Sequence, residues 1–348
     1  MTARAAGRRP YAAWHVGRRG EVAGGMTQVV NGYLAWDFER FDVDVIVSRD
    51  GSGGPRAVRL FLSAAGRIVT LPRRSTPVVV VHLSQGGSFV REGLLLLLAR
   101  ATRTATVAHL HGSSFAAFAR QRPRLTGRVL RAADLVLALS DESAATASSF
   151  VPAERVRRVP NVVAGDRPEP KEHRVVFGGT VGRRKGVDVL LAAWRGLDTT
   201  DWTLDVVGPV ADPDVVDETV PHVVVHGARP HAELMGLLRR ASVAVLPSRD
   251  EALPMFLLEA LARDACVIAT DVGGIPALLE GDAGIVVPAG EIEPLRRALE
   301  SVMVSEARRQ ELVEKGRARF AERYSADSAY PVIESLWLDA LRRRRPTA

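Results

Sequence analysis

Continuous apolar segments of strand length recur along the first half of the chain and alternate with segments of helical spacing. The strand-like segments occupy residues 12–17, 41–48, 77–84, 104–112 and 134–140. Runs of Val, Leu and Ile without polar alternation are typical of strands that are buried on both faces of a parallel sheet. Strands that alternate with helices are joined by right-handed crossovers, so the pattern predicts an α/β fold.

The alternation stops near residue 165 and then begins again. The segment "RVRRVPNVVAGDRPEPKEHR" is rich in proline and charge, which indicates a linker. New strand-like segments follow at residues 174–180, 203–208, 222–227, 243–247, 266–270 and 283–288. We therefore predict two doubly wound, Rossmann-like domains at 1–165 and 166–325, and a C-terminal helix at 326–348 that packs back toward the first domain and ends in a basic tail. Ligands of such sheets bind beyond the carboxyl ends of the strands.

The composition agrees with two folded domains. The chain has 348 residues, of which 47% are apolar and 25% charged, enough for two cores and unlike a disordered protein. The single cysteine, Cys266, excludes an intrachain disulfide and fits a reducing compartment. The basic first residues are followed by no apolar segment of signal-peptide type, and no apolar run is long enough to span a bilayer.

The net charge of +7 comes almost entirely from arginine. A basic balance favours anionic partners, which include nucleic acid, a membrane surface and anionic substrates, although drift in composition explains it equally well. The arginines are scattered and accompany no nucleic-acid motif, so we expect no nucleic-acid partner. We expect a cytoplasmic protein, with the basic N-terminus and "LRRRRPTA" able to contact the anionic inner face of a membrane.

A glycine-rich loop opens the second domain in "FGGTVGRRKGVDVLLAA". The loop enters a helix, where free backbone N–H groups attract anions, and Arg183, Arg184 and Lys185 add full charges. The spacing is not that of a P-loop. The pattern indicates a phosphate-binding loop, and the alternative is a solvated β–α turn.

Two glutamates, Glu251 and Glu259, flank a helix start in "RDEALPMFLLEALAR". Pro254 suits the first position of a helix, so Glu251 should lie on the loop beyond a strand and Glu259 about one turn into the helix. Beside an anion site, such acids can bind sugar hydroxyls. The alternative is an acid that stabilises a helix start together with one surface glutamate.

This stretch resembles the E-x7-E signature of the retaining glycosyltransferases of family 4, which have the GT-B fold. Four more segments resemble that family in the expected order: "GGMTQVV", "HLHGSSF", "VPNVV" and "GGTVGRRKGVDVLLAAW". The resemblance covers most of the chain. It implies an acceptor-binding first domain and a second domain that binds a UDP- or GDP-sugar as donor.

The resemblance also implies roles for residues of the second domain. Glu259 would bind the ribose, Glu251 would lie at the sugar, and Lys185 would bind the diphosphate. Where the family often has an early arginine, this chain has Gly178 and Gly179. Arg183 or Arg184 would substitute, and we predict that Arg184 binds the donor. Backbone N–H groups for the sugar and phosphates would come from Leu253, Pro254, Met255 and Phe256.

In the first domain, the resemblance makes His111 a neighbour of the transferred sugar. Gly24 and Gly25 would let the backbone approach the phosphates. His109 is better explained as a strand residue that faces the core.

No metal site is expected. The D-x-D motifs at Asp42–Asp44 and Asp212–Asp214 lie in a strand pattern and a proline-containing loop, and no Cys/His cluster has zinc spacing. We therefore predict independence of metal and cofactor. The resemblance implies a hexosyltransferase that acts with retention in polysaccharide, glycolipid or natural-product glycoside synthesis. The alternatives are a non-hydrolysing nucleotide-sugar epimerase of the same fold and a non-catalytic relative that binds anionic partners.

Overall fold

The computed structural model describes residues 9–18, 20, 25–71, 76–166, 169–217 and 219–344. The chain divides into two compact units, one formed by residues 1–159 and 329–348 and the other by residues 160–328. The division after Val159 precedes the position at 165/166 that the sequence indicated, because Pro160 and Asn161 already pack with the second unit. Among the described residues, no helix is long and apolar enough to cross a membrane.

The first unit contains a six-stranded parallel sheet in the order β2-β1-β3-β4-β5-β6. Its strands are β1 (Tyr11–Gly17), β2 (Phe41–Val47), β3 (Thr76–Leu83), β4 (Ala105–Leu110), β5 (Leu135–Ala138) and β6 (Val156–Arg158). The strand order reverses between β1 and β3, which are neighbours although α1, β2 and α2 separate them in sequence. Strand β6 lies inside the segment that we predicted to be a linker, so that part of the prediction was wrong.

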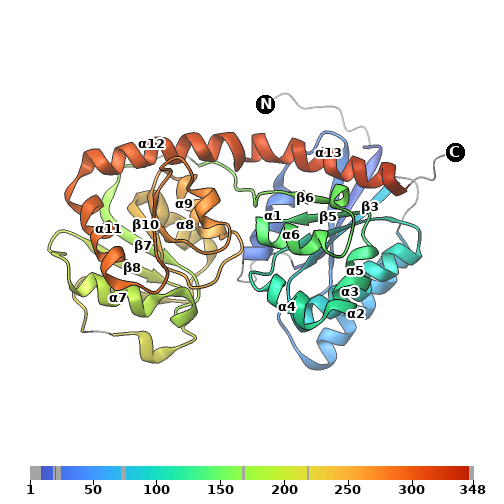
Figure 1. Cartoon of the computed structure of the whole chain (residues 1–348), viewed down its shortest axis with the longest axis horizontal. Helices are drawn as coiled ribbons and strands as arrows, with labels where there is room; N and C mark the ends of the chain where they lie inside the picture. Colours follow the sequence, from blue (N-terminus) through green and yellow to red (C-terminus); the bar gives the residue numbers. More distant parts are fainter. Residues whose placement is uncertain are drawn as a thin grey trace. The chain divides into compact units, whose positions relative to one another are not determined.

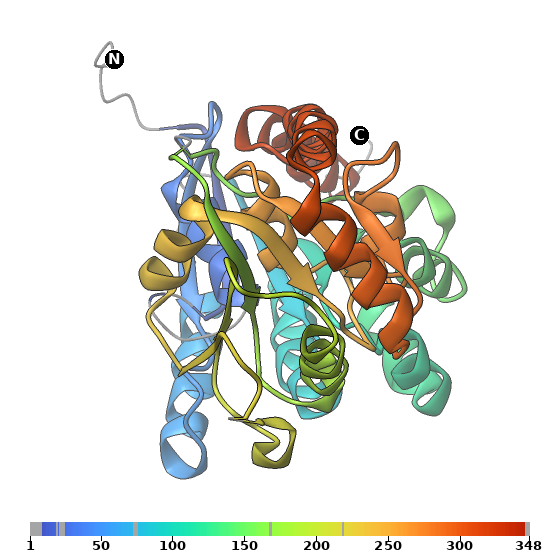
Figure 2. The same ribbon diagram turned by 90° about the vertical axis from the view of Figure 1, so that its left-hand side faces the viewer.

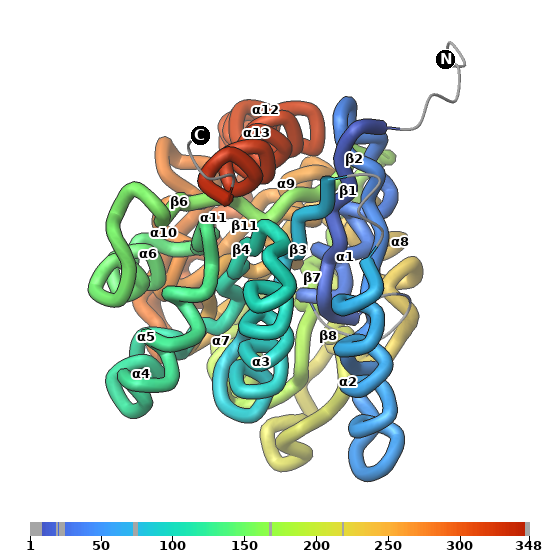
Figure 3. The backbone as a smooth tube through the Cα atoms, turned by 90° about the vertical axis from the view of Figure 1, so that its right-hand side faces the viewer, coloured from blue at the N-terminus to red at the C-terminus, as the bar shows by residue number. Residues whose placement is uncertain are grey.

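Helices cover the first sheet and include the C-terminal helix α13. They are α1 (Gly25–Ala35), α2 (Gly54–Val69), α3 (Gly87–Ala101), α4 (Phe115–Gln121), α5 (Pro123–Arg131), α6 (Asp141–Ser148), the short helix η1 (Ala153–Arg155) and α13 (Ala326–Arg344). Figure 3 shows α3 beside β3 and β4, with α2 next to it. Trp337 of α13 is fully buried and packs against Phe38 and Phe41 of the first unit, with ring centroids 4.9 and 5.3 Å apart.

The second unit contains another six-stranded parallel sheet, in the order β12-β11-β10-β7-β8-β9. Figure 1 labels three of its strands, β7, β8 and β10. Its strands are β7 (Glu172–Gly178), β8 (Thr203–Val207), β9 (Val223–Gly227), β10 (Ala241–Leu246), β11 (Cys266–Thr270) and β12 (Ile285–Val287). The order reverses between β7 and β10, which lie side by side. The carboxyl ends of these two strands therefore define the position where a doubly wound sheet binds its ligand.

Helices follow the strands of the second unit in its described part, and the two short helices η2 and η3 come after β7 and β8. They are η2 (Arg183–Lys185), α7 (Val187–Arg195), η3 (Pro213–Val215), α8 (His231–Arg240), α9 (Met255–Leu261), α10 (Ile275–Leu278), α11 (Ile292–Val304), α12 (Glu306–Arg323) and the first residues of α13. Helices α11 and α12 pack against β11 and are drawn in orange to red in Figure 2. The two sheets with their flanking helices confirm the predicted α/β fold with two Rossmann-like domains.

Candidate active site

The loop after β7 turns sharply at Gly186. This residue has φ of 71°, and a Cβ atom there would lie 1.9 Å from the carbonyl oxygen of Pro247. Only glycine fits, because any side chain would combine a left-handed backbone with a steric clash. The close contact brings Lys185, the residue before Gly186, to the loop that follows β10.

Lys185 and Glu251 form an ion pair at the switch point of the second sheet. The Nζ atom of Lys185 donates to Oε1 of Glu251, and the Ser248 hydroxyl donates to the same oxygen at 2.7 Å. The two side chains are only 14% and 9% exposed. The loops after β7 and β10 thus hold a cation and an anion together in a largely desolvated position, where their charges are screened little by water.

The neighbouring arginines have different environments. Arg183 pairs with Asp214, and its backbone N–H donates to Asp212 at 2.8 Å. Arg249 makes a two-point contact with Asp188, with both N···O distances at 2.8 Å. The exposed Arg184 donates to the carbonyl of Asp250 at 3.2 Å, and no carboxylate of the described residues forms an ion pair with it. Among the residues that the structure describes, the charge of Arg184 is thus not paired with a carboxylate, and its place next to Lys185 in the chain suits an anion.

Glu259 lies in the first turns of α9, and its side chain is 6% exposed. Its Oε1 atom is 2.8 Å from Nε2 of His231, the first residue of α8. The start of α9 is held by Asn161, whose Nδ2 donates to the carbonyl of Leu253 at 2.7 Å. This contact gives a structural role to the "VPNVV" segment, which the sequence marked only by resemblance.

The stretch before and within α9 contains the four residues whose backbone N–H groups we predicted to bind the sugar and phosphates. Leu253 and Pro254 precede the helix, whereas Met255 and Phe256 are its first residues, and all four are buried. Pro254 has no N–H, so it cannot donate as the prediction required. Gly273 packs against this loop, since a Cβ there would lie 1.8 Å from the carbonyl oxygen of Glu251.

The predicted residues of the first unit lie at the carboxyl end of its own sheet. His111 follows β4, is half-buried, and its Nε2 is 2.8 Å from Nδ1 of His82. Burial and the neighbouring His109 lower the pKa of His111 well below its usual value. Gly25 is the first residue of α1, and Gly24 lies outside the described residues. The structure thus places the predicted residues in two groups, one on each unit.

Several contacts were not visible in the sequence. Ser248 and His231 touch the two glutamates: His231 reaches Glu259 through a tertiary contact, whereas Ser248 lies on the same loop, three residues before Glu251. The only local signal was the position of Ser248 at the end of a strand pattern. The D-x-D motif at Asp212–Asp214 holds Arg183, as an ion pair and a backbone contact.

Comparisons with known proteins find a family match in the second unit. A family model described as Glycosyl transferases group 1 matches residues 172–304. Glycogen synthase of Mycobacterium tuberculosis is 28% identical over 191 residues, which cover 52% of this chain and 46% of that protein. The lipopolysaccharide core biosynthesis mannosyltransferase LpcC of Rhizobium leguminosarum is 30% identical over 205 residues, covering 52% and 57%. The chain spans about half the length of the curated relatives that it matches.

Solved structures resemble nearly the whole chain. Sucrose-phosphate synthase from Thermosynechococcus elongatus has a TM-score of 0.73 and 18% identity, covering 96% of this chain and 100% of its own. Anabaena HepE, solved in complex with UDP-glucose, has a TM-score of 0.71 and 16% identity, covering 93% and 99%. At such identities the likeness concerns the fold, and the chain has the GT-B fold that the sequence predicted.

Proposed function

We propose that the whole protein is a retaining glycosyltransferase of family 4 that transfers a hexosyl group from a UDP- or GDP-sugar to an acceptor. The observation that carries the proposal is the Lys185–Glu251–Ser248 cluster on the two loops that meet at the switch point of the second sheet. The glycosyltransferase family match over the same unit and the UDP-glucose bound to a protein of the same fold support it. The matched relatives are glycosyltransferases, which does not favour the epimerase alternative.

The charges of this cluster suit the departure of a nucleoside diphosphate. As the sugar–oxygen bond breaks, negative charge grows on the phosphate and positive charge on the sugar ring. Lys185 and Arg184 would stabilise the phosphate, and Glu251 would face the developing positive charge. Fixed charges in a desolvated site need little reorganisation during the reaction. We propose that these cations replace a divalent metal ion at the diphosphate.

The ribose of the donor would bind Glu259. His231 already occupies one oxygen of this carboxylate, so it orients Glu259 and leaves the other oxygen for a hydroxyl. The acceptor would bind the first unit, where His111 would lie near the transferred sugar.

The experiment is a panel of nucleotide-sugars tested for thermal stabilisation and for release of the free nucleotide. A bound donor raises the free energy of unfolding by RT ln(1 + [L]/Kd), so the true donor should stand out. With that donor, NMR of the product should show the same anomeric configuration as the donor. Inversion would refute the retaining assignment. If a nucleotide-sugar stabilises the protein but no nucleotide is released with any of the acceptors tested, the result would instead support the alternative of a non-catalytic relative.

We also propose peripheral contact with anionic membranes through α2 and α3. In α3, residues 91–100 form the apolar segment "REGLLLLLAR". Leu95 and Leu96 of this segment are fully buried in the core, but Leu94 is exposed. On the adjacent α2, Val58 and Leu62 are exposed one turn apart. The exposed Arg59 is next to Val58 in the chain, and a basic side chain near apolar ones is suited to anionic headgroups. The basic N-terminal residues 1–8 and Arg345 lie outside the described residues.

A further inference from the structure

Four histidines gather at the carboxyl end of the first sheet. His15 lies on β1, His82 on β3 and His109 on β4, and His111 follows β4. These three strands are consecutive neighbours in the sheet, and His82 and His109 occupy paired positions. The cluster exists because the strand order brings together residues that are far apart in sequence.

Two hydrogen bonds join three of the rings. Nδ1 of His15 is 2.8 Å from Nε2 of His82, and Nδ1 of His82 is 2.8 Å from Nε2 of His111. Each bond needs one protonated and one unprotonated nitrogen. Consequently, if Nδ1 of His82 presents a lone pair, its Nε2 carries the proton and donates to His15.

His109 is the exception within the cluster. The side chain is fully buried, and among the described residues neither ring nitrogen has a hydrogen-bond partner. A buried polar group without a partner costs about 1–3 kcal/mol, so such groups call for a ligand. The ring centroid of His109 lies 4.1 Å from that of His111 and 5.3 Å from that of His82.

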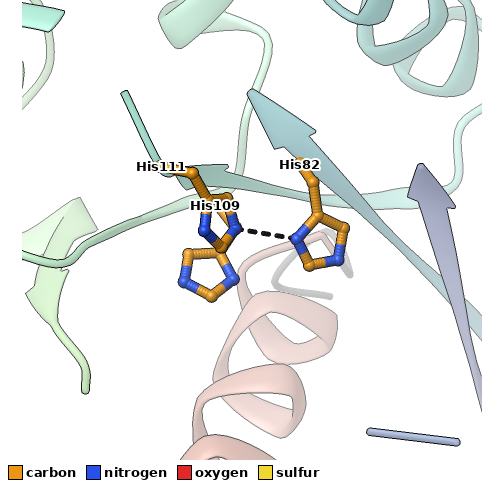
Figure 4. A group of neighbouring side chains, drawn as sticks. All are labelled: His82, His109 and His111. Carbon is orange, nitrogen blue, oxygen red and sulfur yellow. Dashed lines mark hydrogen bonds between the residues drawn. The ribbon is translucent and has the colours of Figure 1, made fainter. Parts of the chain in front are cut away.

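We propose that His82, His109 and His111 form a site for a divalent transition-metal ion that prefers imidazole, with Zn²⁺ as the best match. One nitrogen of each ring lies within 4.8 Å of the other two. Figure 4 shows the three side chains gathered together. Three histidines with a fourth position open is a known zinc arrangement, whereas Mg²⁺ and Mn²⁺ prefer oxygen ligands. With Zn–N bonds of about 2.0–2.1 Å, tetrahedral geometry places the nitrogens about 3.3 Å apart.

The hydrogen bonds of the cluster also suit a metal ion, because only an unprotonated ring nitrogen can bind one. His15 would serve as the outer partner: its Nδ1 accepts a hydrogen bond from the Nε2–H of His82 and fixes the orientation of that ring. The ion would replace the direct contact between His82 and His111 and would give His109 its missing partner.

The surrounding charges do not exclude a cation. Arg49 is a positive group near His82 and His111. The fully buried carboxylate of Glu92 lies 3.6 Å from Nε of Arg49 and 3.1 Å from Nε of Arg91, so it offsets the charge of Arg49 in part. His111 is half-buried, which gives an ion a route to the buried nitrogens.

The site belongs to the first unit and is separate from the phosphate cations of the second unit in its chemistry. The proposed ion joins the ends of β3 and β4 and has no part in the departure of the diphosphate. His111 is also the residue proposed to lie near the transferred sugar, so the test of the site measures metal binding and does not depend on turnover.

The test is Co²⁺ binding by the untagged, metal-free full chain. Co²⁺ should bind with a stoichiometry of about one per chain, give the intense visible absorption of tetrahedral coordination, and be displaced by Zn²⁺. Zn²⁺ should also raise the thermal midpoint, as expected for a ligand of the folded state. His111→Gln should weaken binding at least 100-fold, and His15→Gln about 10–100-fold as an outer partner.

The matched control is His173→Gln, since His173 is exposed and stacks on Trp202 in the other unit. This variant should bind Co²⁺ as the unchanged chain does. His111 is chosen because it is half-buried and its replacement spares the core. A wild-type chain without the tetrahedral spectrum at saturating Co²⁺ would overturn the proposal, and so would a folded His111→Gln chain that retains it.

Discussion

Breaking the Lys185–Glu251 pair should lower both activity and stability. Replacing both residues together should restore most of the stability but not the activity. In Lys185→Gln, the carboxylate of Glu251 stays in a position where it is only 9% exposed and loses its cation. Removing one member of a buried ion pair is costly because the remaining charge is left without compensation. The proposed reaction also loses the charge that answers the departing phosphate.

The magnitudes follow from the burial of the pair. Lys185 keeps 14% exposure, so the loss of stability should lie at the low end of the range for buried pairs, about 3 kcal/mol. Loss of a fixed electrostatic contact in the transition state costs about 2.7–4 kcal/mol, which lowers kcat about 100- to 1000-fold. Glu251→Gln should lower kcat by at least about tenfold with little change in donor affinity, because its charge acts mainly in the transition state.

The double variant, Lys185→Gln with Glu251→Gln, separates folding from catalysis. It buries no unpaired charge, so urea unfolding should return most of the lost stability. The rate of nucleotide release, measured with the donor chosen by the panel, should stay at or below that of the poorer single variant. If the rate recovers together with stability, the single variants were inactive because they folded badly. Wild-type kcat in a folded Glu251→Gln chain would equally refute the reasoning and make Glu251 a loop acid near a helix start.

Four further predictions use other parts of the molecule. Glu259→Gln should raise KM more than it lowers kcat, because the ribose contact is present in both ground and transition states, and a selective fall in kcat would contradict that role. Turnover should survive excess EDTA in the absence of added Mg²⁺ or Mn²⁺, and activity restored only by either ion would reject metal independence; rescue by Zn²⁺ alone would point to the histidine site of the first unit. The chain should float with anionic liposomes at low salt and dissociate as salt is raised, with Leu62→Ser weaker, whereas absence of binding at low salt would remove the membrane contact. The metal-free chain should lose stability on acidification, because His15 and His109 have a folded pKa of about 3 against about 6.5 when unfolded, so the unfolded state binds more protons. The free energy of unfolding should be highest above pH 6.5 and fall toward pH 3, and each residue should contribute about 2 kcal/mol of the loss at pH 5. Urea unfolding across that range should show a smaller dependence of stability on pH for His109→Gln.

The sequence predicted the strands whose burial on both faces forces a continuous apolar run. Strand β6 was missed because it lies at the edge of the sheet and consists of Val156, Arg157 and Arg158. An edge strand pairs on one side only, so it needs no such run, and the nearby prolines suggested a linker instead.

The candidate site was partly visible because its loops follow strands directly. Lys185 and Glu251 each carried a local pattern, and the sheet order then placed their loops together. The histidine cluster had no comparable signal. His82 and His109 meet only through the pairing register of β3 and β4, and a search for short Cys/His spacing cannot detect such a contact.

The path of α13 has a consequence for synthesis on the ribosome. Residues 160–328 form a contiguous unit, whereas the first unit is completed by residues 329–344, so translation delivers its final part after the whole second unit. Until Trp337 arrives, Phe38 and Phe41 lack an aromatic partner that they pack against in the finished fold. The unit that is translated first is therefore the one that finishes folding last, and during that interval its exposed aromatic surface is the part of the nascent chain that most needs protection from aggregation.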